Sequence, residues 1–287
     1  MMKELTINWH ITEACNFKCA YCFAHWENKP CKKELLHNTQ DVITLLNEFE
    51  KMQYSFPQEF NSIRLNLVGG ETFLYHSAII NIIKEAKKRN FRLSAITNGS
   101  KLDSELNKMI AKNFDIIGFS VDSVINKTNL SLGRQEMNKT IIIEKLIKDI
   151  NEIREINPSI ELKINTVVNK LNYLEDLTQF INKVKPTKWK VFKMLPILPR
   201  SNSLKISDEQ FQIFLNTHQE HKEIINGENN DDMINSYIMV DPNGRFFQNI
   251  KGQEKYTYSD EIHKVGIEEA FSQIDFDIEK FKRRYRK

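Results

Sequence analysis

Residues 6–22 read TINWHITEACNFKCAYC, a short apolar run followed by three cysteines, Cys15, Cys19 and Cys22, in CxxxCxxC spacing. The run is rich in β-branched and aromatic residues and predicts a strand over 6–12. The three thiols then lie on the loop that follows this strand. Clustered thiols in a reducing compartment are more typical of metal or redox sites than of disulfides, so this loop is the first candidate site.

The strand over 6–12 is the first in an alternating series of predicted strands and helices. Strands are predicted over 6–12, 62–68, 92–97, 115–122, 161–168 and 189–195, and helices over 41–52, 78–88, 103–113, 140–156 and 174–184. Strands joined by helices pair in parallel, because each crossover needs a dozen or more residues. A complete eight-unit barrel needs roughly 250 residues, whereas this series stops after Pro199. We therefore predict an α/β fold, a partial (β/α)6 barrel over 1–199 with an N-terminal cluster loop.

The remaining segment, 200–287, is predicted to be an irregular extension of the same domain that closes the active site. It contains a predicted helix over 208–221, an Asn-rich stretch over 225–232, a hairpin around Asp241-Pro242-Asn243-Gly244 and two charged C-terminal helices. No repeat or change of composition marks a linker.

Composition limits the possible partners. The chain of 287 residues is 40% hydrophobic and has a formal net charge of +3, which gives no basic stripe for nucleic acid. No run approaches 18 apolar residues, and the N-terminus has no signal-peptide pattern. We expect a cytoplasmic monomer that binds no nucleic acid and no membrane.

Three thiolates on one loop favour an iron–sulfur cluster. Four Cys normally hold a cluster, so three leave one iron of a [4Fe-4S] cluster open to a ligand that is not protein. A zinc site is the alternative and needs a fourth ligand, for which Cys31, His10 and His25 are the nearest candidates. Cys31 lies beyond the loop and is expected to be a spare thiol.

Two neighbouring predicted strands carry cations where buried parallel strands are normally apolar. Lys163 and Asn165 share one face of the fifth strand, and Lys188 and Lys190 share one face of the sixth. Lys is seldom buried without a partner, so an anion with several charges, such as a nucleoside triphosphate, would suit this face. The alternative is that the strands end early and the lysines lie on a solvated rim.

Two further features resemble the radical S-adenosylmethionine (SAM) superfamily: Tyr21 before the third cysteine, and Gly69-Gly70-Glu71 after the second predicted strand. In that superfamily SAM chelates the open iron, and the diglycine-acid segment binds the amino group of SAM. Glycine lets the backbone approach a ligand closely, and Glu71 supplies a partner for an ammonium. The resemblance implies a [4Fe-4S] cluster on Cys15, Cys19 and Cys22, with SAM as the second cofactor.

The sequence also resembles the viperin family of that superfamily over nearly its whole length. The matching segments are NWHIT at 8–12, TNGS at 97–100, FSVDS at 119–123, LGR at 132–134, KINTVVN at 163–169, KWKVF at 188–192, SYI at 236–238 and VGIEEA at 265–270. They occur in the family's order, so the chain resembles a prokaryotic viperin.

The resemblance to viperins implies roles for single residues. Asn98, Ser120 and Arg134 would hold the methionine and ribose parts of SAM. The nucleotide would be held by Asn8, Arg64, Asn66, Lys163, Asn165, Lys188, Lys190 and, more loosely, Asn230. Arg64 and Lys188 replace a Lys and an Arg of the animal pattern, so the preference among CTP, UTP and GTP stays open. Tyr237 would deliver a proton or hydrogen, although a Tyr on a short strand is more often a packed aromatic.

The activity that the family implies is lyase-type dehydration of a ribonucleoside triphosphate to its 3'-deoxy-3',4'-didehydro analogue, a chain-terminating antiviral nucleotide. A radical from SAM would remove the C4' hydrogen, and an external donor of the flavodoxin or ferredoxin type would supply electrons. One alternative is a radical SAM enzyme that acts on a peptide or partner protein, although no Cys follows Cys31 to form the Cys-rich domain common in such enzymes. A structural metal or nucleotide-sensing module is the non-enzyme alternative.

Overall fold

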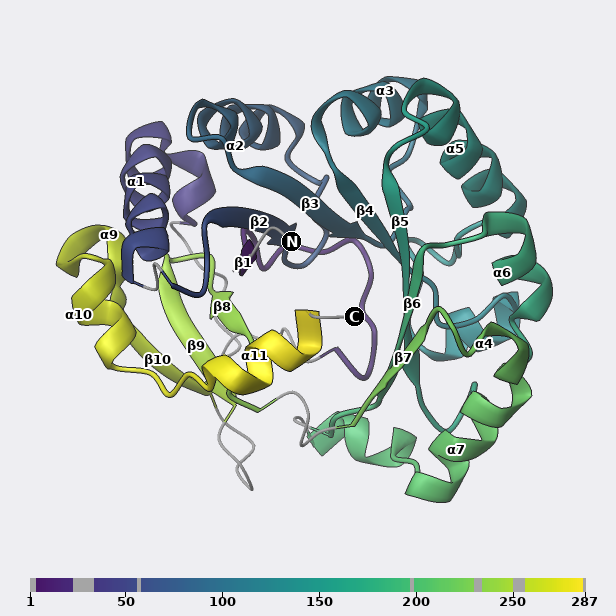
Figure 1. Cartoon of the computed structure of the whole chain (residues 1–287). Coiled ribbons are helices and arrows are strands. Elements are labelled where there is room, and N and C mark those ends of the chain that lie inside the picture. The colour runs from purple at the N-terminus through teal and green to yellow at the C-terminus, as the bar shows by residue number, and fades with distance from the viewer. Residues whose placement is uncertain are drawn as a thin grey trace. The chain divides into compact units, whose positions relative to one another are not determined.

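Strands joined by helices account for most of the chain (Figure 1). The structure is a computed structural model that describes residues 4–22, 34–55, 58–196, 199–229, 234–249 and 256–285. The chain folds as two units. The first unit comprises Met1–Cys15, Ala24–Ala95 and Asp231–Lys287, and the second comprises Asn16–Phe23 and Ile96–Asn230.

The first unit combines parallel strands with an antiparallel C-terminal part. Its strands are β1 (Glu4–His10), β2 (Ser62–Val68), β3 (Arg92–Thr97, up to Ala95), β8 (Ile238–Val240), β9 (Arg245–Asn249) and β10 (Tyr256–Glu261). They are ordered β10-β9-β8-β1-β2-β3, with β8, β1, β2 and β3 parallel and β8, β9 and β10 antiparallel. Its helices are η1 (Leu35–His37), α1 (Thr39–Ser55), α2 (His76–Lys88), α9 (Ile262–Val265), α10 (Ile267–Ser272) and α11 (Ile278–Tyr285).

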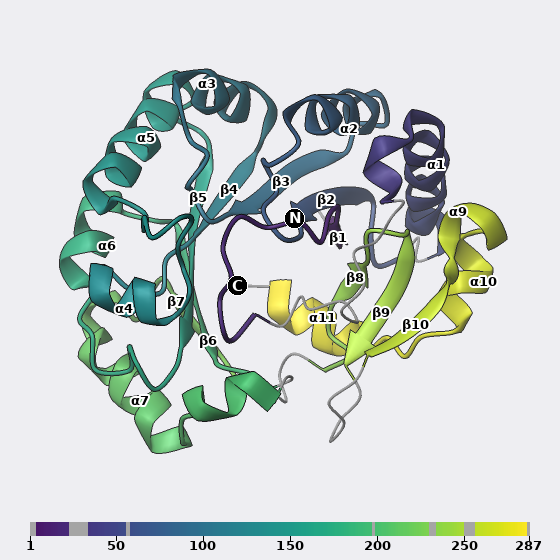
Figure 2. The same ribbon diagram turned by 180° about the vertical axis from the view of Figure 1, so that it is seen from behind.

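The second unit has a parallel sheet in the order β4-β5-β6-β7. The strands are β4 (Ile116–Ser120), β5 (Glu161–Val168), β6 (Lys188–Lys193) and β7 (Ile225–Glu228). The helices are α3 (Ser104–Asn113), α4 (Asn126–Ser131), α5 (Ile143–Ile156), α6 (Thr178–Val184), η2 (Pro199–Leu204), α7 (Asp208–Thr217) and η3 (Gln219–His221). Both views place α3, α5 and α6 along one face of this sheet (Figure 2).

Each sheet buries apolar residues on the face that the helices cover. In the first unit Leu5, Ile7 and Trp9 of β1 are fully buried, and Trp9 meets Phe49 of α1 edge-on at 6.3 Å. In the second unit Trp189 of β6 packs in the same way on Phe214 of α7 at 6.0 Å. Because side chains alternate along a strand, the residues between these apolar positions lie on the opposite face.

The strands predicted over 62–68, 92–97 and 161–168 are confirmed with these bounds, and the other three are present with ends shifted by up to two residues. The five predicted helices are also present. Asp103 caps α3, since its Oδ1 accepts from the Leu106 amide at 2.8 Å. The hairpin at Asp241–Gly244 is confirmed as the turn between β8 and β9, with Gly244 at φ +76°.

The segment after Pro199 contains the predicted helix over 208–221, as α7 and η3, but it is more regular than predicted. The Asn-rich stretch contains β7, which pairs in parallel with β6, and β8 pairs in parallel with β1. The sequence INGE of β7 has low strand propensity, so the neighbouring strand and not its own pattern holds it extended. The short helix α4 and the strand β10 were also not predicted. That residues 200–287 form one domain with the barrel stays a prediction.

No helix in the described ranges is both long and apolar enough to cross a membrane.

His10 provides a test of packing in the first unit. It is buried at the end of β1, with its ring edge-on to Phe247 at 5.1 Å. Burial lowers the pKa of His10 from 6.5 to about 3. The folded chain therefore keeps His10 neutral at a pH where the unfolded chain takes up a proton. Above pH 6.5 His10 is neutral in both states and does not change the free energy of unfolding. Between pH 6.5 and 3 only the unfolded chain takes up the proton, so the free energy of unfolding falls by about 1.4 kcal/mol for each pH unit.

We predict that the free energy of unfolding falls by about 1.4 kcal/mol more for the native chain than for His10→Gln between pH 7.5 and 5.5. Urea unfolding at the two pH values measures the difference. An equal loss in both proteins would contradict the buried, neutral imidazole.

Candidate functional site

The three predicted cluster ligands lie on the loop after β1, and none of them forms a disulfide. Cys15 is exposed and belongs to the first unit, whereas Cys19 and Cys22 are half-buried in the second. Within the described ranges no three His, Cys, Asp or Glu side chains are gathered as a metal-binding group. The donor set itself fits, because three thiols are what a cluster with one open iron takes from the protein. His10 packs on Phe247, while Cys31 and His25 lie outside the described residues.

In the first unit Gly69 and Gly70 lie directly on the start of this loop. The Gly70 amide donates to the Thr12 carbonyl at 2.7 Å, and the Glu71 amide donates to the Ala14 carbonyl at 2.9 Å. A Cβ on Gly70 would stand 2.1 Å from the Ala14 oxygen, and one on Gly69 would stand 2.6 Å from the Thr12 oxygen. Glycine is therefore required at both positions by the approach of one main chain to another.

Glu34, which the sequence did not single out, holds the same segment of the first unit. Its Oε2 accepts from the Thr12 hydroxyl at 2.7 Å, and its Oε1 accepts from the Glu13 amide at 2.6 Å. The side chain is buried. A carboxylate that satisfies a main-chain amide and a hydroxyl at once fixes the chain just before Cys15.

In the second unit the loop around Cys19 rests on the end of α4. The Lys18 amide donates to the Gly133 carbonyl and the Ala20 amide to the Leu132 carbonyl, each at 3.0 Å. Gly133 has φ +74°, and a Cβ there would stand 2.2 Å from the Lys18 oxygen. The LGR segment therefore contains glycine for the same reason as the diglycine segment.

Arg134, Asp122 and Tyr21 form a buried cluster beneath Cys19. Arg134 Nη1 lies 2.7 Å from Asp122 Oδ2 and donates to the Tyr21 hydroxyl at 3.1 Å, and the Tyr21 hydroxyl donates to Asp122. Nη2 of Arg134 donates to the Ser120 carbonyl. Burial raises the pKa of the Cys19 thiol, against the opposing effect of Arg134. The Arg134 guanidinium, which is predicted to hold SAM, thus also fixes Tyr21 and Asp122 next to the Cys19 thiol.

Asn98 braces the loop from another side of the second unit. Its Nδ2 donates to Asn16 Oδ1 at 3.0 Å, and its Oδ1 accepts from the Ser100 amide at 2.8 Å. Asn16, directly after Cys15, also donates to Glu136 Oε2 at 2.8 Å. Asn98 therefore lies beside the cysteine loop, as its predicted role requires.

Asn8 and Asn66 lie side by side in the first unit. They are paired in register on β1 and β2, and Asn66 Nδ2 donates to Asn8 Oδ1 at 2.8 Å. Arg64 lies two residues nearer the amino end of β2, where its Nε is 3.1 Å from Glu4 Oε2 and its Nη2 donates to Thr6. The charge of Arg64 is therefore already balanced by a carboxylate that the sequence did not indicate.

The shared face of the predicted lysines is confirmed in the second unit. Lys163 pairs in register with Lys188, and Asn165 with Lys190. All four side chains are half-buried, so the strands do not end early. Lys190 Nζ lies 2.9 Å from Oε1 of the buried Glu228, a partner that the sequence missed because β7 was not predicted. Asn165 Oδ1 is buried and has no hydrogen-bond partner among the described residues.

The two remaining candidates are Tyr237 and Asn230. Tyr237 is half-buried and directly precedes β8, where Met239 pairs with Asn8. By strand alternation its side chain shares the face of Met239 and Asn8. Its role stays a prediction. Asn230 lies outside the described residues.

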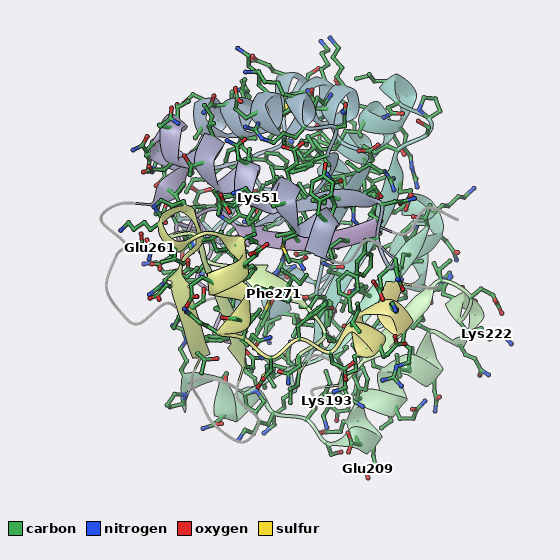
Figure 3. All side chains as sticks on the ribbon, turned by 60° about the vertical axis from the view of Figure 1, so that its left-hand side comes forward. Lys51, Lys193, Glu209, Lys222, Glu261 and Phe271 are labelled. Atoms are coloured by element: carbon green, nitrogen blue, oxygen red, sulfur yellow. The ribbon has the colours of Figure 1, made fainter. Side chains whose placement is uncertain are left out.

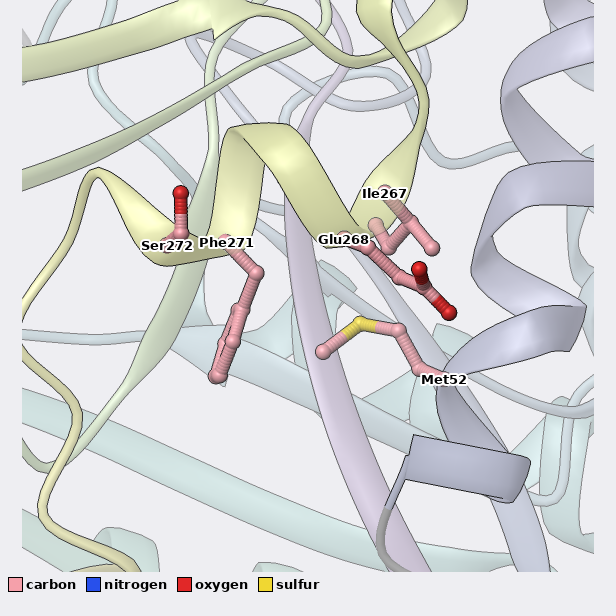
Figure 4. Close-up of a pocket in the computed structure, with 5 residues that line it drawn as sticks. All are labelled: Met52, Ile267, Glu268, Phe271 and Ser272. Atoms are coloured by element: carbon pink, nitrogen blue, oxygen red, sulfur yellow. The ribbon is translucent and has the colours of Figure 1, made fainter.

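A pocket elsewhere on the first unit contains none of these residues. It lies between α1 and α10 and is lined by Met52, Ile267, Glu268, Phe271 and Ser272 (Figure 4). The charged side chains of Lys51 in the first unit, and of Glu209 and Lys222 in the second, are exposed and are labelled in Figure 3. Because this pocket contains no predicted site residue, the candidate site consists of the cysteine loop and the polar faces of the strands.

Comparison with known proteins agrees with this geometry. The family model of the Radical SAM superfamily matches residues 9–184. An S-adenosylmethionine-dependent nucleotide dehydratase of Psychrobacter lutiphocae is 50% identical over 99% of the chain and 96% of the relative. Another, of Pseudoalteromonas ulvae, is 37% identical over 99% of the chain and 94% of the relative.

The chain belongs to the SAM-dependent nucleotide dehydratases, the viperin family of radical SAM enzymes. Enzymes of this superfamily use a [4Fe-4S] cluster and SAM, so both cofactors belong to this viperin-family protein.

Solved structures share the fold. The structure of anSMEcpe with bound AdoMet superposes with a TM-score of 0.69 at 15% identity, covering 97% of this chain and 84% of that one. SuiB of Streptococcus suis bound to S-adenosylmethionine gives a TM-score of 0.63 at 16% identity, covering 98% and 67%. The predicted α/β fold, a partial radical SAM barrel, is confirmed.

We predict that Gly70→Ala weakens SAM binding at least tenfold, because its Cβ would stand 2.1 Å from a main-chain oxygen that cannot turn away. Titration of the reconstituted enzyme with SAM and its iron content measure the effect. Gly227→Ala is the matched control, since the nearest atom to a Cβ there is a Leu215 methyl, at 3.4 Å. Unchanged SAM affinity in Gly70→Ala would contradict the close approach.

Proposed function

We propose that the protein converts a ribonucleoside triphosphate to its 3'-deoxy-3',4'-didehydro analogue, a chain-terminating nucleotide for antiviral defence. The proposal is carried by the polar face of β5 and β6, where Lys163 lies opposite Lys188 and Asn165 opposite Lys190. Half-buried cations in register on a parallel sheet favour a ligand with several negative charges. The relatives named nucleotide dehydratases support a nucleotide as that ligand.

Cys15, Cys19 and Cys22 would hold the cluster, and the segment Gly69–Glu71, together with Asn98, Ser120 and Arg134, would hold SAM. With both cofactors bound, the chemistry supplied at this site would be a 5'-deoxyadenosyl radical able to take the C4' hydrogen of the nucleotide. Loss of the 3'-hydroxyl as water, with one further electron and one proton, completes the product. The protein fixes the ribose against the radical source and excludes water from it.

The order of residues along the strands supports one orientation of the nucleotide. In the second unit, the pair Lys163 and Lys188 lies two residues nearer the amino ends of the strands than Asn165 and Lys190. The phosphates would therefore lie toward the amino ends and the ribose toward the carboxyl ends. The loop after β1 and the diglycine segment after β2 both follow carboxyl ends in the first unit. Ligands of open α/β sheets generally bind beyond the carboxyl ends of the strands.

In the first unit Asn8, Asn66 and Arg64 would contribute to nucleotide binding, with Tyr237 on the same face as Asn8 as the candidate donor of a proton or hydrogen. Asn230 is retained as a looser candidate. We further propose a cytoplasmic monomer, an external electron donor of the flavodoxin or ferredoxin type, and CTP, UTP or GTP as substrate.

The decisive experiment follows the abstracted hydrogen. We predict that the reduced enzyme transfers deuterium from a 4'-deuterated nucleoside triphosphate into 5'-deoxyadenosine, detected by mass spectrometry, whereas 2'- or 3'-deuterated nucleotides transfer none. Cys19→Ala should abolish formation of 5'-deoxyadenosine, and Cys31→Ala, the matched cysteine control, should retain it. If the deuterium in 5'-deoxyadenosine came from the solvent and not from the nucleotide, a peptide or partner protein would be the better assignment of the substrate.

A second prediction concerns charge. Lys163→Ala and Lys188→Ala should each weaken triphosphate binding by about 1.5 to 3 kcal/mol, roughly 10- to 150-fold in Kd, because each loses a charge-assisted contact. Binding of the monophosphate should change far less. Lys170→Ala is the control, since this lysine is exposed in the same unit. Calorimetry measures all three variants, and equal native affinity for mono- and triphosphate would rule out the phosphate contacts.

A further inference from the structure

A directed chain of side-chain hydrogen bonds runs across four neighbouring strands of the first unit. The Ser94 hydroxyl of β3 donates to Asn66 Oδ1 at 2.7 Å, and Asn66 Nδ2 of β2 donates to Asn8 Oδ1 at 2.8 Å. Asn8 Nδ2 of β1 then donates to the main-chain carbonyl of Ile238 in β8 at 3.1 Å. Both views show these strands side by side (Figures 1 and 2).

The Ile238 carbonyl sets the direction of this chain, because a carbonyl can only accept. If the Asn8 amide were turned over, two acceptors would face each other without a proton between them. With Asn8 fixed, a turned Asn66 would likewise place its oxygen against Asn8 Oδ1. Asn66 Oδ1 therefore has to face Ser94, whose hydroxyl can donate or accept and here must donate.

Ser94 differs from the two asparagines in its exposure. Ser94 is buried, at 4% exposure, whereas Asn8 and Asn66 are half-buried. Its hydroxyl is also directed along the sheet, to Asn66 Oδ1. Ser94 therefore influences a bound ligand by fixing the orientation of the Asn66 amide.

We propose that Ser94 is a positioning residue, which holds Asn66 and, through it, Asn8 in the single amide orientation that the Ile238 carbonyl permits. Each amide keeps one N–H and one oxygen lone pair for a ligand. The inference rests on the proposed function, since the ligand of these amides would be the nucleotide. A preset orientation means that binding loses less side-chain freedom.

The test compares Ser94→Ala with Ser94→Thr, which keeps a hydroxyl, in the reconstituted enzyme with SAM. Ser94→Ala should weaken nucleoside triphosphate binding about three- to tenfold by calorimetry, the range expected for one neutral hydrogen bond. It should also release more 5'-deoxyadenosine per dehydrated nucleotide, while the Kd of SAM stays unchanged. Ser94→Thr should restore most of the affinity.

Ser62→Ala is the matched control. Ser62 lies on the same face of β2 as Asn66, and its buried hydroxyl has no hydrogen-bond partner in the described part of the chain. Loss of this hydroxyl should leave nucleotide affinity as in the native enzyme. Equal losses in Ser62→Ala and Ser94→Ala would overturn the proposal, because a general effect on the sheet would then explain both.

A double-mutant cycle with Asn66→Ala tests the path of action, even if Ser94→Thr fails to fold. In the Asn66→Ala background, Ser94→Ala should change nucleotide Kd by less than about twofold. The same three- to tenfold loss in both backgrounds would overturn the proposal, as would native affinity in Ser94→Ala. If the native enzyme itself bound no nucleotide, the proposed function would fail first, and the two failures are thereby distinguished.

Discussion

The close approach of main chain to main chain at three glycines is the constraint on which the cysteine loop depends. In the first unit Gly69 and Gly70 lie against Thr12 and Ala14, and in the second Gly133 lies against Lys18. A Cβ at any of the three positions would stand 2.1 to 2.6 Å from a backbone oxygen. Because backbone atoms cannot rotate away as a side chain can, the loop keeps its path only with glycine.

Division of each sheet into an apolar and a polar face places the functional side chains. Trp9 and Trp189 lie on the helix-covered faces, and the residues before and after them face the other way. Polar residues on a parallel sheet are costly unless they are paired. Here Arg64 contacts Glu4, and Lys190 contacts Glu228. These partners hold the cations in place in the folded chain.

Local pattern explains which features could be predicted. The bounds of β2, β3 and β5 follow from short apolar runs, and the shared face of Lys163 and Asn165 follows from alternation alone. Pairing between distant segments could not be predicted. Tyr21 and Asp122 are 101 residues apart, and the Glu228 that holds Lys190 lies on a strand that only its neighbour keeps extended. Glu34 belongs to no recognisable motif, and only the fold brings it into contact with Thr12 and Glu13.

The predicted cations of the second unit lie in two different arrangements. Lys190 has a buried carboxylate at 2.9 Å, so this pair is close to neutral. Lys163 and Lys188 lie directly opposite each other on adjacent strands, an arrangement in which like charges repel. An anion placed beside Lys163 and Lys188 is attracted by both charges at once, and beside Lys190 it meets the Glu228 carboxylate as well. The register of the two strands therefore supports phosphate binding at Lys163 and Lys188, and the fixed position of Lys190 beside Glu228 suits it to a neutral part of the same ligand.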